Sequence, residues 1–185
     1  GCGIYRSVWL HMASAVSAAP HGIRAVTAAL DGSSAVVEVS TALTGTADSV
    51  TYELADAEGQ VLATAEGLGT VQLAANGITP WTPETPALYI LRVTVTANGT
   101  ADTAEQRIGI RTIQVSSKTG LLLNGQPRTM KGGCIHHDLG ILGAADHAAA
   151  ERRRIRLMKE SGFDAIRAAH NPFGPAFLDA CDELG

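Results

Sequence analysis

The chain has 185 residues, of which 45% are apolar and 17% are charged, and its formal net charge is −4. This composition predicts one or two small packed domains and excludes a mainly disordered chain. The acidic balance argues against non-specific nucleic-acid binding, which needs a basic face, and no apolar run reaches the roughly 20 residues that span a bilayer. The sequence therefore predicts neither a nucleic-acid partner nor a membrane partner, and it leaves localisation open.

Short strands separated by tight turns are predicted up to about residue 113. Apolar and polar residues alternate in AVVEVSTAL (35–43), SVTYELAD (49–56) and ALYILRVTV (87–95), as a half-buried antiparallel sheet requires. Glycine follows Asp, Glu or Asn at four turns, where positive φ is tolerated. About seven such strands favour an immunoglobulin-like β-sandwich, although its usual Cys…Trp…Cys core is missing. The expected inward residues are Val37, Val39, Leu43, Val50, Tyr52, Leu54, Tyr89, Leu91, Val93 and Val95.

The pattern changes near residue 114. LLLNGQPRTMKGGCIH predicts a hairpin that turns at Asn124-Gly125 and leads into a strand. ADHAAAERRRIRLMKESG predicts a helix capped by Asp146, with Ile155 and Met158 facing inward and Gly162 at its end. A strand, FDAIRAA, then precedes a helix over GPAFLDACDELG.

Pro175 is expected in the first turn of that last helix, and Phe177, Leu178, Cys181 and Leu184 on its inward face. Strand, helix, strand, helix is the beginning of an α/β fold with a parallel sheet. The segment is much shorter than the ~250 residues of a barrel, so we expect it to be truncated. The alternative is that these two units fold as a rudimentary lid on the sandwich.

Polar clusters follow both strands of this second part. His136-His137-Asp138 follows the first, and His170-Asn171-Pro172 follows the second. Ligands bind at the carboxyl ends of parallel strands because the loops converge there. Arg167 lies within an apolar strand, and a buried arginine must be paired, either with a structural carboxylate or with one in an active site. Taken alone, HHD is often only a polar loop, and HNP is also typical of a simple turn.

Three further residue types have alternative interpretations. Cys2, Cys134 and Cys181 form no CxxC pair, which favours reduced, partly buried thiols. Zinc binding by Cys134 with the two adjacent histidines lacks a fourth ligand, so no cofactor is predicted. Trp81, among three prolines, favours packing at the sandwich edge over a stacking platform for a sugar.

Five motifs in order resemble glycoside hydrolase family 2, particularly its β-galactosidase-like members. GIYRSVWL is similar to the closing strand of the family's N-terminal jelly-roll domain, with Ser7 in place of aspartate. PWTPETPALYILRVTV resembles its immunoglobulin-like domain, and IGIRTIQV resembles the segment leading into the barrel, with Ile108 in place of Phe. LLLNGQPRTMKGGCIHHDLGILGAA and IRAAHNPFGPAFLDACDELG resemble the first two strand–helix units of that barrel.

The resemblance implies a retaining glycosidase with two catalytic glutamates on later barrel strands, beyond residue 185. Glu151, Glu160 and Glu183 do not match them and are interpreted as solvent-facing helix residues, so no catalytic residue is predicted here and the 185-residue chain is expected to be inactive. The implied substrate-binding positions have separate roles. Arg167 would hold the nucleophilic carboxylate, His136 and His170 would contact the sugar, Asn171 lies beside His170, and Asp138 belongs to a part of the motif that varies among branches.

These expectations combine into a mainly β chain: an immunoglobulin-like β-sandwich followed by the truncated start of an α/β (TIM) barrel. The expected domains are the last jelly-roll strand (1–20), the sandwich (21–113) and the first two barrel units (114–185). The predicted function is part of a retaining β-glycosidase acting on β-galactosides, with the remaining domains of the same polypeptide as partners. The alternative is a non-catalytic β-sandwich accessory or interaction module, which a stop codon directly after Gly185 would favour.

Overall fold

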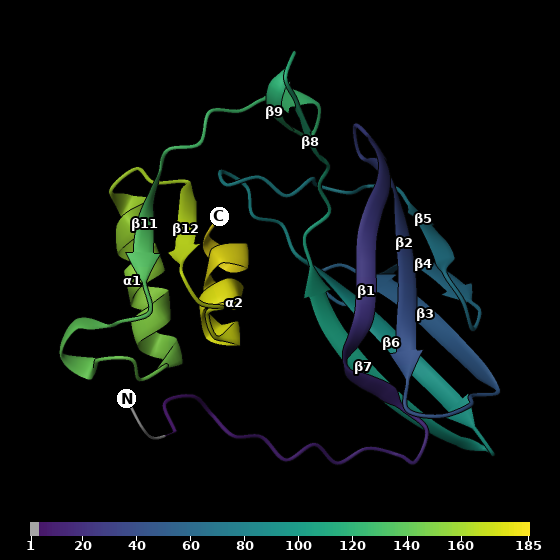
Figure 1. Ribbon diagram of the computed structural model, residues 1–185. Helices are drawn as coiled ribbons and strands as arrows, with labels where there is room; N and C mark the ends of the chain where they lie inside the picture. The colour runs from purple at the N-terminus through teal and green to yellow at the C-terminus, as the bar shows by residue number, and fades with distance from the viewer. Residues whose placement is uncertain (1–3) are drawn as a thin grey trace. The chain divides into compact units, whose positions relative to one another are not determined.

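The computed structural model describes residues 4–185 (Figure 1). The chain divides into two compact units. The sandwich unit contains residues 11–81 and 87–127, and the strand–helix unit contains residues 128–185 together with residues 82–86 and the described residues up to Leu10. No helix among the described residues is long and apolar enough to cross a membrane.

Within the sandwich unit, two antiparallel sheets with seven strands form the sandwich itself. One sheet has the order β1 (Ala18–Asp31), β2 (Ser34–Leu43) and β5 (Val71–Ala75). The other has the order β4 (Val61–Glu66), β3 (Ser49–Ala55), β6 (Tyr89–Ala97) and β7 (Thr100–Ile108). The predicted β-sandwich is confirmed.

The sandwich core has the composition that the alternating pattern predicts. Nine of the ten expected inward residues are buried, and Leu43 packs against them while partly exposed. The glycines of the four predicted turns, Gly32, Gly59, Gly77 and Gly99, all have positive φ. At these turns a side chain would strain the backbone, which is why the sequence places glycine there.

Trp81 packs inside the sandwich unit rather than forming an open platform. The residue is 8% exposed, its backbone N–H donates to the Ile110 carbonyl at 2.9 Å, and the Arg111 guanidinium lies 4.3 Å from the ring centroid. A Cβ at Gly109 would approach the indole to 2.9 Å, so only glycine lets the ring lie this close. The packing role that we favoured is confirmed, and the Gly109–Arg111 segment forms one wall of the tryptophan's environment.

The predicted hairpin is confirmed at Asn124-Gly125. It joins β9 (Gly120–Leu123) to β10 (Gln126–Pro127), and β8 (Ile113–Ser116) pairs with the other edge of β9. Asn124 and Gly125 have φ values of 51° and 75°, as a tight hairpin turn needs. The Asn124 side chain accepts from Thr112 N–H at 2.9 Å and donates to the Trp81 carbonyl at 3.1 Å. This amide therefore ties the hairpin to the tryptophan environment.

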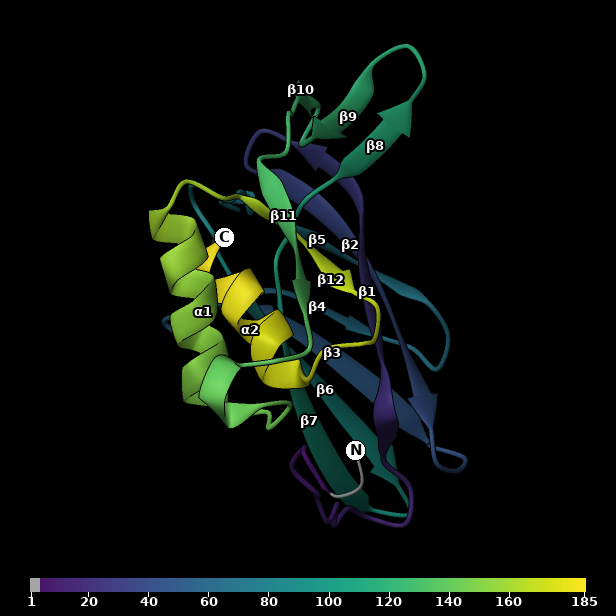
Figure 2. The ribbon, with the colours of Figure 1, turned by 60° about the vertical axis from the view of Figure 1, so that its left-hand side comes forward.

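The strand–helix unit has two parallel strands, β11 (Gly132–His136) and β12 (Ala165–Ala169). The short 3-10 helix η1 (Gly140–Leu142) and helix α1 (Ala148–Glu160) connect them, and α2 (Pro175–Leu184) follows β12. Both α-helices lie on the same side of the strand pair (Figure 2). The core between them contains Ile155, Phe173, Phe177 and Ala180, and Ile135 and Ile166 pack against it from the strands.

Four local expectations in this unit and before it were wrong. Residue 4 to residue 17 contains no strand, because no neighbouring strand among the described residues pairs with this segment. Asp146 is not the cap of α1; His147 holds that place and makes no side-chain cap bond. Leu178 is 56% exposed, because it lies about 100° around the helix from Phe177, outside the buried stripe. Glu151 is 1% exposed rather than solvent-facing.

An ion network stabilises the strand–helix unit near the start of its two strands. Arg128 donates to the carboxylates of Glu84 and Asp164, both at 2.7 Å, and Lys131 N–H donates to Asp164 at 2.7 Å. The Arg128 hydrogen bonds lower the pKa of Glu84 to about 2. Burial alone would raise the pKa of Asp164, but the Lys131 N–H and the Arg128 guanidinium outweigh it and lower that pKa. Lys159 donates to the carbonyls of Pro83 and Gly185 nearby.

Candidate functional site

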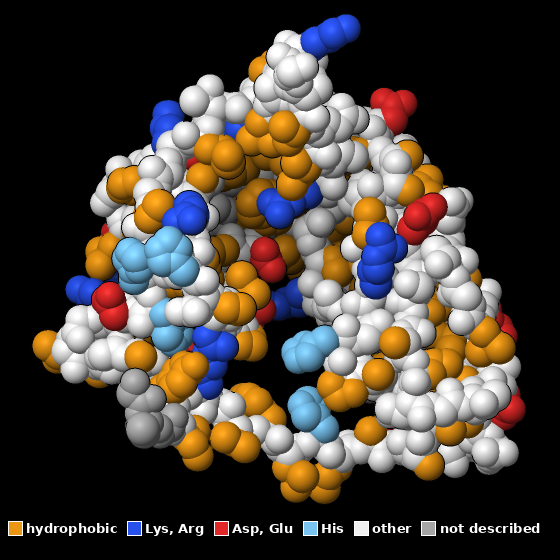
Figure 3. Space-filling model, in the orientation of Figure 1, with side chains coloured by type: hydrophobic (Ala, Val, Ile, Leu, Met, Phe, Trp, Pro, Cys, Tyr) orange, Lys and Arg blue, Asp and Glu red, His pale blue; other side chains and the backbone are white. Residues whose placement is uncertain are grey.

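The carboxyl ends of β11 and β12 bring two imidazoles together. His136 is the last residue of β11 and is in register with Ala169, the last residue of β12, which His170 follows. The two rings meet edge-to-face with centroids 5.6 Å apart and an interplanar angle of 69°. Both side chains are exposed, and Figure 3 shows histidine side chains gathered on the surface at this end of β11. The predicted juxtaposition is confirmed, whereas the sugar-binding role of the two residues stays a prediction.

His137 belongs to the interior and not to this edge. Its ring packs edge-to-face against Phe173 at 5.4 Å and against Tyr5 at 5.6 Å, and both ring nitrogens are buried without a hydrogen-bond partner. Successive residues at a strand end point to opposite faces. The two adjacent histidines therefore separate into one site-facing and one core-facing imidazole.

Arg167 is exposed, so its predicted burial was wrong. It is in register with Cys134, and its Nη1 lies 3.8 Å from the Cys134 sulfur. Paired residues of parallel strands point to the same face, which here is the face opposite the helices. Cys134, His136 and Arg167 are all exposed on that face, and no described carboxylate pairs with the guanidinium. Arg167, Cys134 and His136 thus share one open surface of the strand pair.

Asp138 and Asn171 lie in the loops that follow the two strands, with exposed side chains. The backbone of Asp138 is firmly held: its N–H donates to the His136 carbonyl at 2.8 Å, and its carbonyl accepts from Arg154 at 2.5 Å. On the other loop, Arg6 donates to the Pro172 carbonyl. Both polar loops are therefore anchored through their backbones, which leaves the side chains of Asp138 and Asn171 available to a ligand.

Sequence reasoning missed Arg154 and Glu151. Arg154 hydrogen-bonds the loop that follows β11 and pairs with the buried Glu151 carboxylate. A signal was present, since residues 151, 154, 155 and 158 have the i, i+3, i+4, i+7 spacing of one helix face. Since Ile155 and Met158 were expected to face inward, the same spacing predicts that Glu151 and Arg154 face inward too.

The described residues contain no group of three or more His, Cys, Asp or Glu side chains arranged to hold a metal ion. The zinc alternative was therefore wrong within this part of the chain, because His137 turns away from Cys134 and His136. Cys134 is a free, exposed thiol, contrary to the expected partial burial. Cys181 is free and half-buried, and burial raises its pKa to about 11. Cys2 lies outside the described residues.

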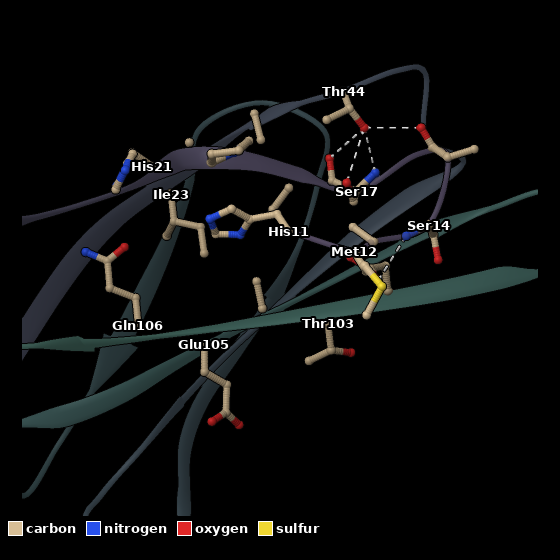
Figure 4. Close-up of a pocket in the computed structure, with 18 residues that line it drawn as sticks. His11, Met12, Ser14, Ser17, His21, Ile23, Thr44, Thr103, Glu105 and Gln106 are labelled. Carbon is tan, nitrogen blue, oxygen red and sulfur yellow. Dashed lines mark hydrogen bonds between the residues drawn. The ribbon is translucent and has the colours of Figure 1, made fainter. Parts of the chain in front are cut away.

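A hollow of about 840 Å³ lies within the sandwich unit, bordered by residues 11–23 and by β7 (Figure 4). His11, His21 and Glu105 line it. The Glu105 carboxylate already pairs with Arg92 at 2.8 Å, so it is not available to the two histidines. In Figure 4 the Glu105 carboxylate points away from His11. Asp102, the other acid of the lining, accepts from the Ser14 N–H at 3.5 Å, so both carboxylates of the hollow already have partners.

Comparison with known protein families decides where the chain belongs. Residues 16–111 match the family described as glycosyl hydrolases family 2, and residues 113–185 match the TIM barrel domain of the same family. The chain belongs to glycoside hydrolase family 2. Its fold is thus the immunoglobulin-like sandwich of this family followed by the start of its TIM barrel domain, as the motifs had indicated.

Individual relatives agree with this assignment. The β-galactosidase BoGH2A of Bacteroides ovatus is 36% identical over 201 aligned positions that cover all of this chain. A family 2 crystal structure from Bacteroides cellulosilyticus is 33% identical over 99% of the chain, with a TM-score of 0.92. A β-glucuronidase of Lactobacillus rhamnosus is 33% identical over 89% of the chain, with a TM-score of 0.80. The chain spans 24%, 27% and 28% of these three proteins, respectively.

Proposed function

We propose that this chain supplies the sandwich and the first sugar-binding strands of a retaining β-glycosidase that hydrolyses terminal β-galactosides. The observation that supports it most directly is the pairing of His136 and His170 at one exposed strand edge. Family membership supports the reaction class, since relatives are named β-galactosidase and β-glucuronidase. The carbohydrate substrate and the remaining domains of the same polypeptide are the partners in this proposal.

The two carboxylates of the reaction come from outside the described residues. Retaining hydrolysis uses a nucleophile and an acid/base about 5–5.5 Å apart, and it passes through a covalent glycosyl intermediate. Three glutamates of the described helices are engaged in ion pairs instead: Glu151 with Arg154, Glu183 with Arg152 and Glu160 with Arg156. We therefore expect the catalytic glutamates on later barrel strands, and we expect the 185-residue chain alone not to hydrolyse glycosides.

The residues at the strand edge would bind the sugar and stabilise the charge that develops in the transition state. The Arg167 guanidinium would lie beside the nucleophilic carboxylate and keep it ionised, because an adjacent cation lowers a carboxyl pKa. His136 and His170 would hydrogen-bond sugar hydroxyls, whose interactions strengthen as charge develops in the transition state. Asn171 and Asp138, on the two loops, would contact further hydroxyls. Each role follows from the side chain's chemistry and its exposed place at the edge.

The preference for galactosides rests on the relatives. BoGH2A, named a β-galactosidase, is 36% identical over the whole chain, whereas a putative β-glucuronidase of Formosa agariphila is 32% identical over the whole chain. A glucuronide carries a carboxylate that needs a cationic partner. Comparing 4-nitrophenyl β-galactoside with 4-nitrophenyl β-glucuronide therefore tests the sugar directly, and a higher kcat/KM on the glucuronide would reverse the assignment.

The site assignment is tested in the polypeptide encoded by the complete reading frame. Arg167→Ala and His170→Ala should each lower kcat/KM about a hundredfold or more, the usual cost of losing a group that stabilises developing charge. Arg156→Ala is the matched control, since its exposed side chain pairs with Glu160 at the end of α1, and it should keep the wild-type rate. Wild-type rates in the Arg167 and His170 variants would contradict the site.

The retaining mechanism has its own readout. Proton NMR of the first-formed sugar should show the β anomer before mutarotation, because two successive inversions restore the original configuration. An initial α product would show an inverting enzyme. Failure of the wild-type polypeptide to hydrolyse any β-glycoside would instead favour the non-catalytic sandwich module.

A further inference from the structure

Arg154 connects the loop after β11 to both helices of the strand–helix unit. One nitrogen, Nη1, donates to two carbonyls, that of Asp138 at 2.5 Å and that of His136 at 3.3 Å. The other, Nη2, donates to the Glu151 carboxylate. The guanidinium also lies over the rings of Phe173 and Phe177, at 5.3 and 5.7 Å from their centroids.

Burying the charges of Glu151 and Arg154 is unfavourable unless the two side chains pair with each other. The Glu151 side chain is 1% exposed and that of Arg154 is 17% exposed, so both charges are largely removed from water. A buried carboxylate without a cation would be strongly unfavourable, and the pair satisfies it. A pair of apolar residues would fill the same space, but it could not bind two backbone carbonyls.

The two carbonyls lie on either side of His137, where the chain turns from the open strand face toward the core. When Arg154 holds both carbonyls, it fixes the backbone at the end of β11 and therefore the orientation of the His136 side chain. The planar guanidinium can bind two acceptors and a carboxylate at once, whereas a lysine ammonium is a compact point charge without this fork.

We propose that Arg154, held by Glu151, is a positioning residue that sets the orientation of His136 relative to His170. The catalytic importance of this orientation rests on the proposed glycosidase function. The positioning itself is a property of the 185-residue chain and can be measured without any substrate.

The first experiment uses amide hydrogen exchange of the 185-residue chain. Arg154→Lys keeps the positive charge beside Glu151 but loses the fork, so it separates charge from geometry. We expect the amides of Asp138 and Leu139, which donate to His136 and Gly143 at 2.8 and 2.7 Å, to exchange at least tenfold faster in this variant. Exchange within α1 and α2 should stay at the wild-type rate.

The control is Arg156→Lys, on the same helix with a side chain that is 58% exposed. It should leave exchange of the loop unchanged. Unchanged loop exchange in Arg154→Lys would overturn the proposal. Faster exchange throughout both helices would also overturn it, because the residue would then act on the general stability of the unit. Should Arg154→Lys fail to fold, Glu151→Gln is the second variant: it removes the carboxylate charge that holds Nη2, and faster exchange confined to the loop is again the expected result, whereas unchanged loop exchange would overturn the proposal.

The second experiment measures hydrolysis by the polypeptide of the complete reading frame. Arg154→Lys should lower kcat/KM ten- to a hundredfold, with Arg156→Lys at the wild-type value, because small displacements of positioned groups are expensive in rate. Wild-type kcat/KM in Arg154→Lys would remove the catalytic part of the proposal. If the wild-type protein hydrolyses no glycoside, the proposed function fails, and the exchange experiment alone still decides the positioning.

Discussion

Phe177→Ala is expected to destabilise the strand–helix unit far more than Leu178→Ala, although the two residues are neighbours on α2. Phe177 is 3% exposed, and its ring centroid lies 4.3 Å from that of Phe173. Removing a buried phenylalanine costs about 3–5 kcal/mol of unfolding free energy. Leu178 is 56% exposed, and full burial of a leucine is worth only about 1.5–3 kcal/mol, so its loss should cost about 1 kcal/mol or less.

A unit with so few buried side chains has little stability to lose, and 3 kcal/mol is a large part of it. Urea unfolding followed by circular dichroism at 222 nm reports on the helices, because α1 and α2 are the α-helices of the described chain. Fluorescence of Trp81, which is 8% exposed, reports on the sandwich unit once Trp9 of the strand–helix unit is replaced by Phe. Equal midpoint shifts for the two variants at 222 nm would refute the assignment of the buried stripe.

Three further changes test other parts of the structure. Gly109→Ala would place a Cβ 2.9 Å from the Trp81 ring, and we expect a loss of about 1–3 kcal/mol in urea unfolding followed by tryptophan fluorescence; an unchanged midpoint would show that the ring can move aside. The folded pKa of Glu84, about 2 against a usual 4.5, means that its pairing with Arg128 stabilises the fold above pH 4.5 and is lost as the pH falls toward 2. Glu84→Gln should therefore flatten the dependence of melting temperature on pH in that range, by a small amount because the side chain is exposed, and an unaltered profile would contradict the pairing. Cys181, with a pKa raised to about 11, should resist iodoacetamide at pH 8 until the chain is unfolded, and rapid labelling of the native chain, measured by mass spectrometry, would contradict its burial.

The sequence pattern was sufficient for most of the fold because burial in a sandwich follows a period of two. Val50, Tyr52 and Leu54 alternate with polar residues, and they are the residues buried between the sheets. The site edge was predictable for a similar reason, since parallel strands deliver their following loops to one edge. This rule places His136 and His170 at one edge from the sequence alone.

Burial that depends on distant segments was not predictable. Arg167 sits among alanines and looks like a buried strand residue, but exposure depends on whether another part of a fold covers its face, and no local pattern records that. The prediction for the ERRR segment (residues 151–154) was wrong for a different reason. Charged side chains usually predict a solvent-exposed helix face. Here Glu151 is buried in the helix interface because Arg154 pairs with it.

The opposite directions of His136 and His137 restrict how the length of this loop can change in evolution. Deleting either histidine would leave a single imidazole, which could occupy either the exposed strand edge or the apolar space beside Phe173, but not both. If that imidazole stayed at the open edge, the carboxylate of Asp138 would shift toward the apolar space between Tyr5 and Phe173, where the second ring now packs. Insertions and deletions should therefore be rarer between residues 136 and 138 than in the glycine-containing loop that follows, even where single substitutions are accepted.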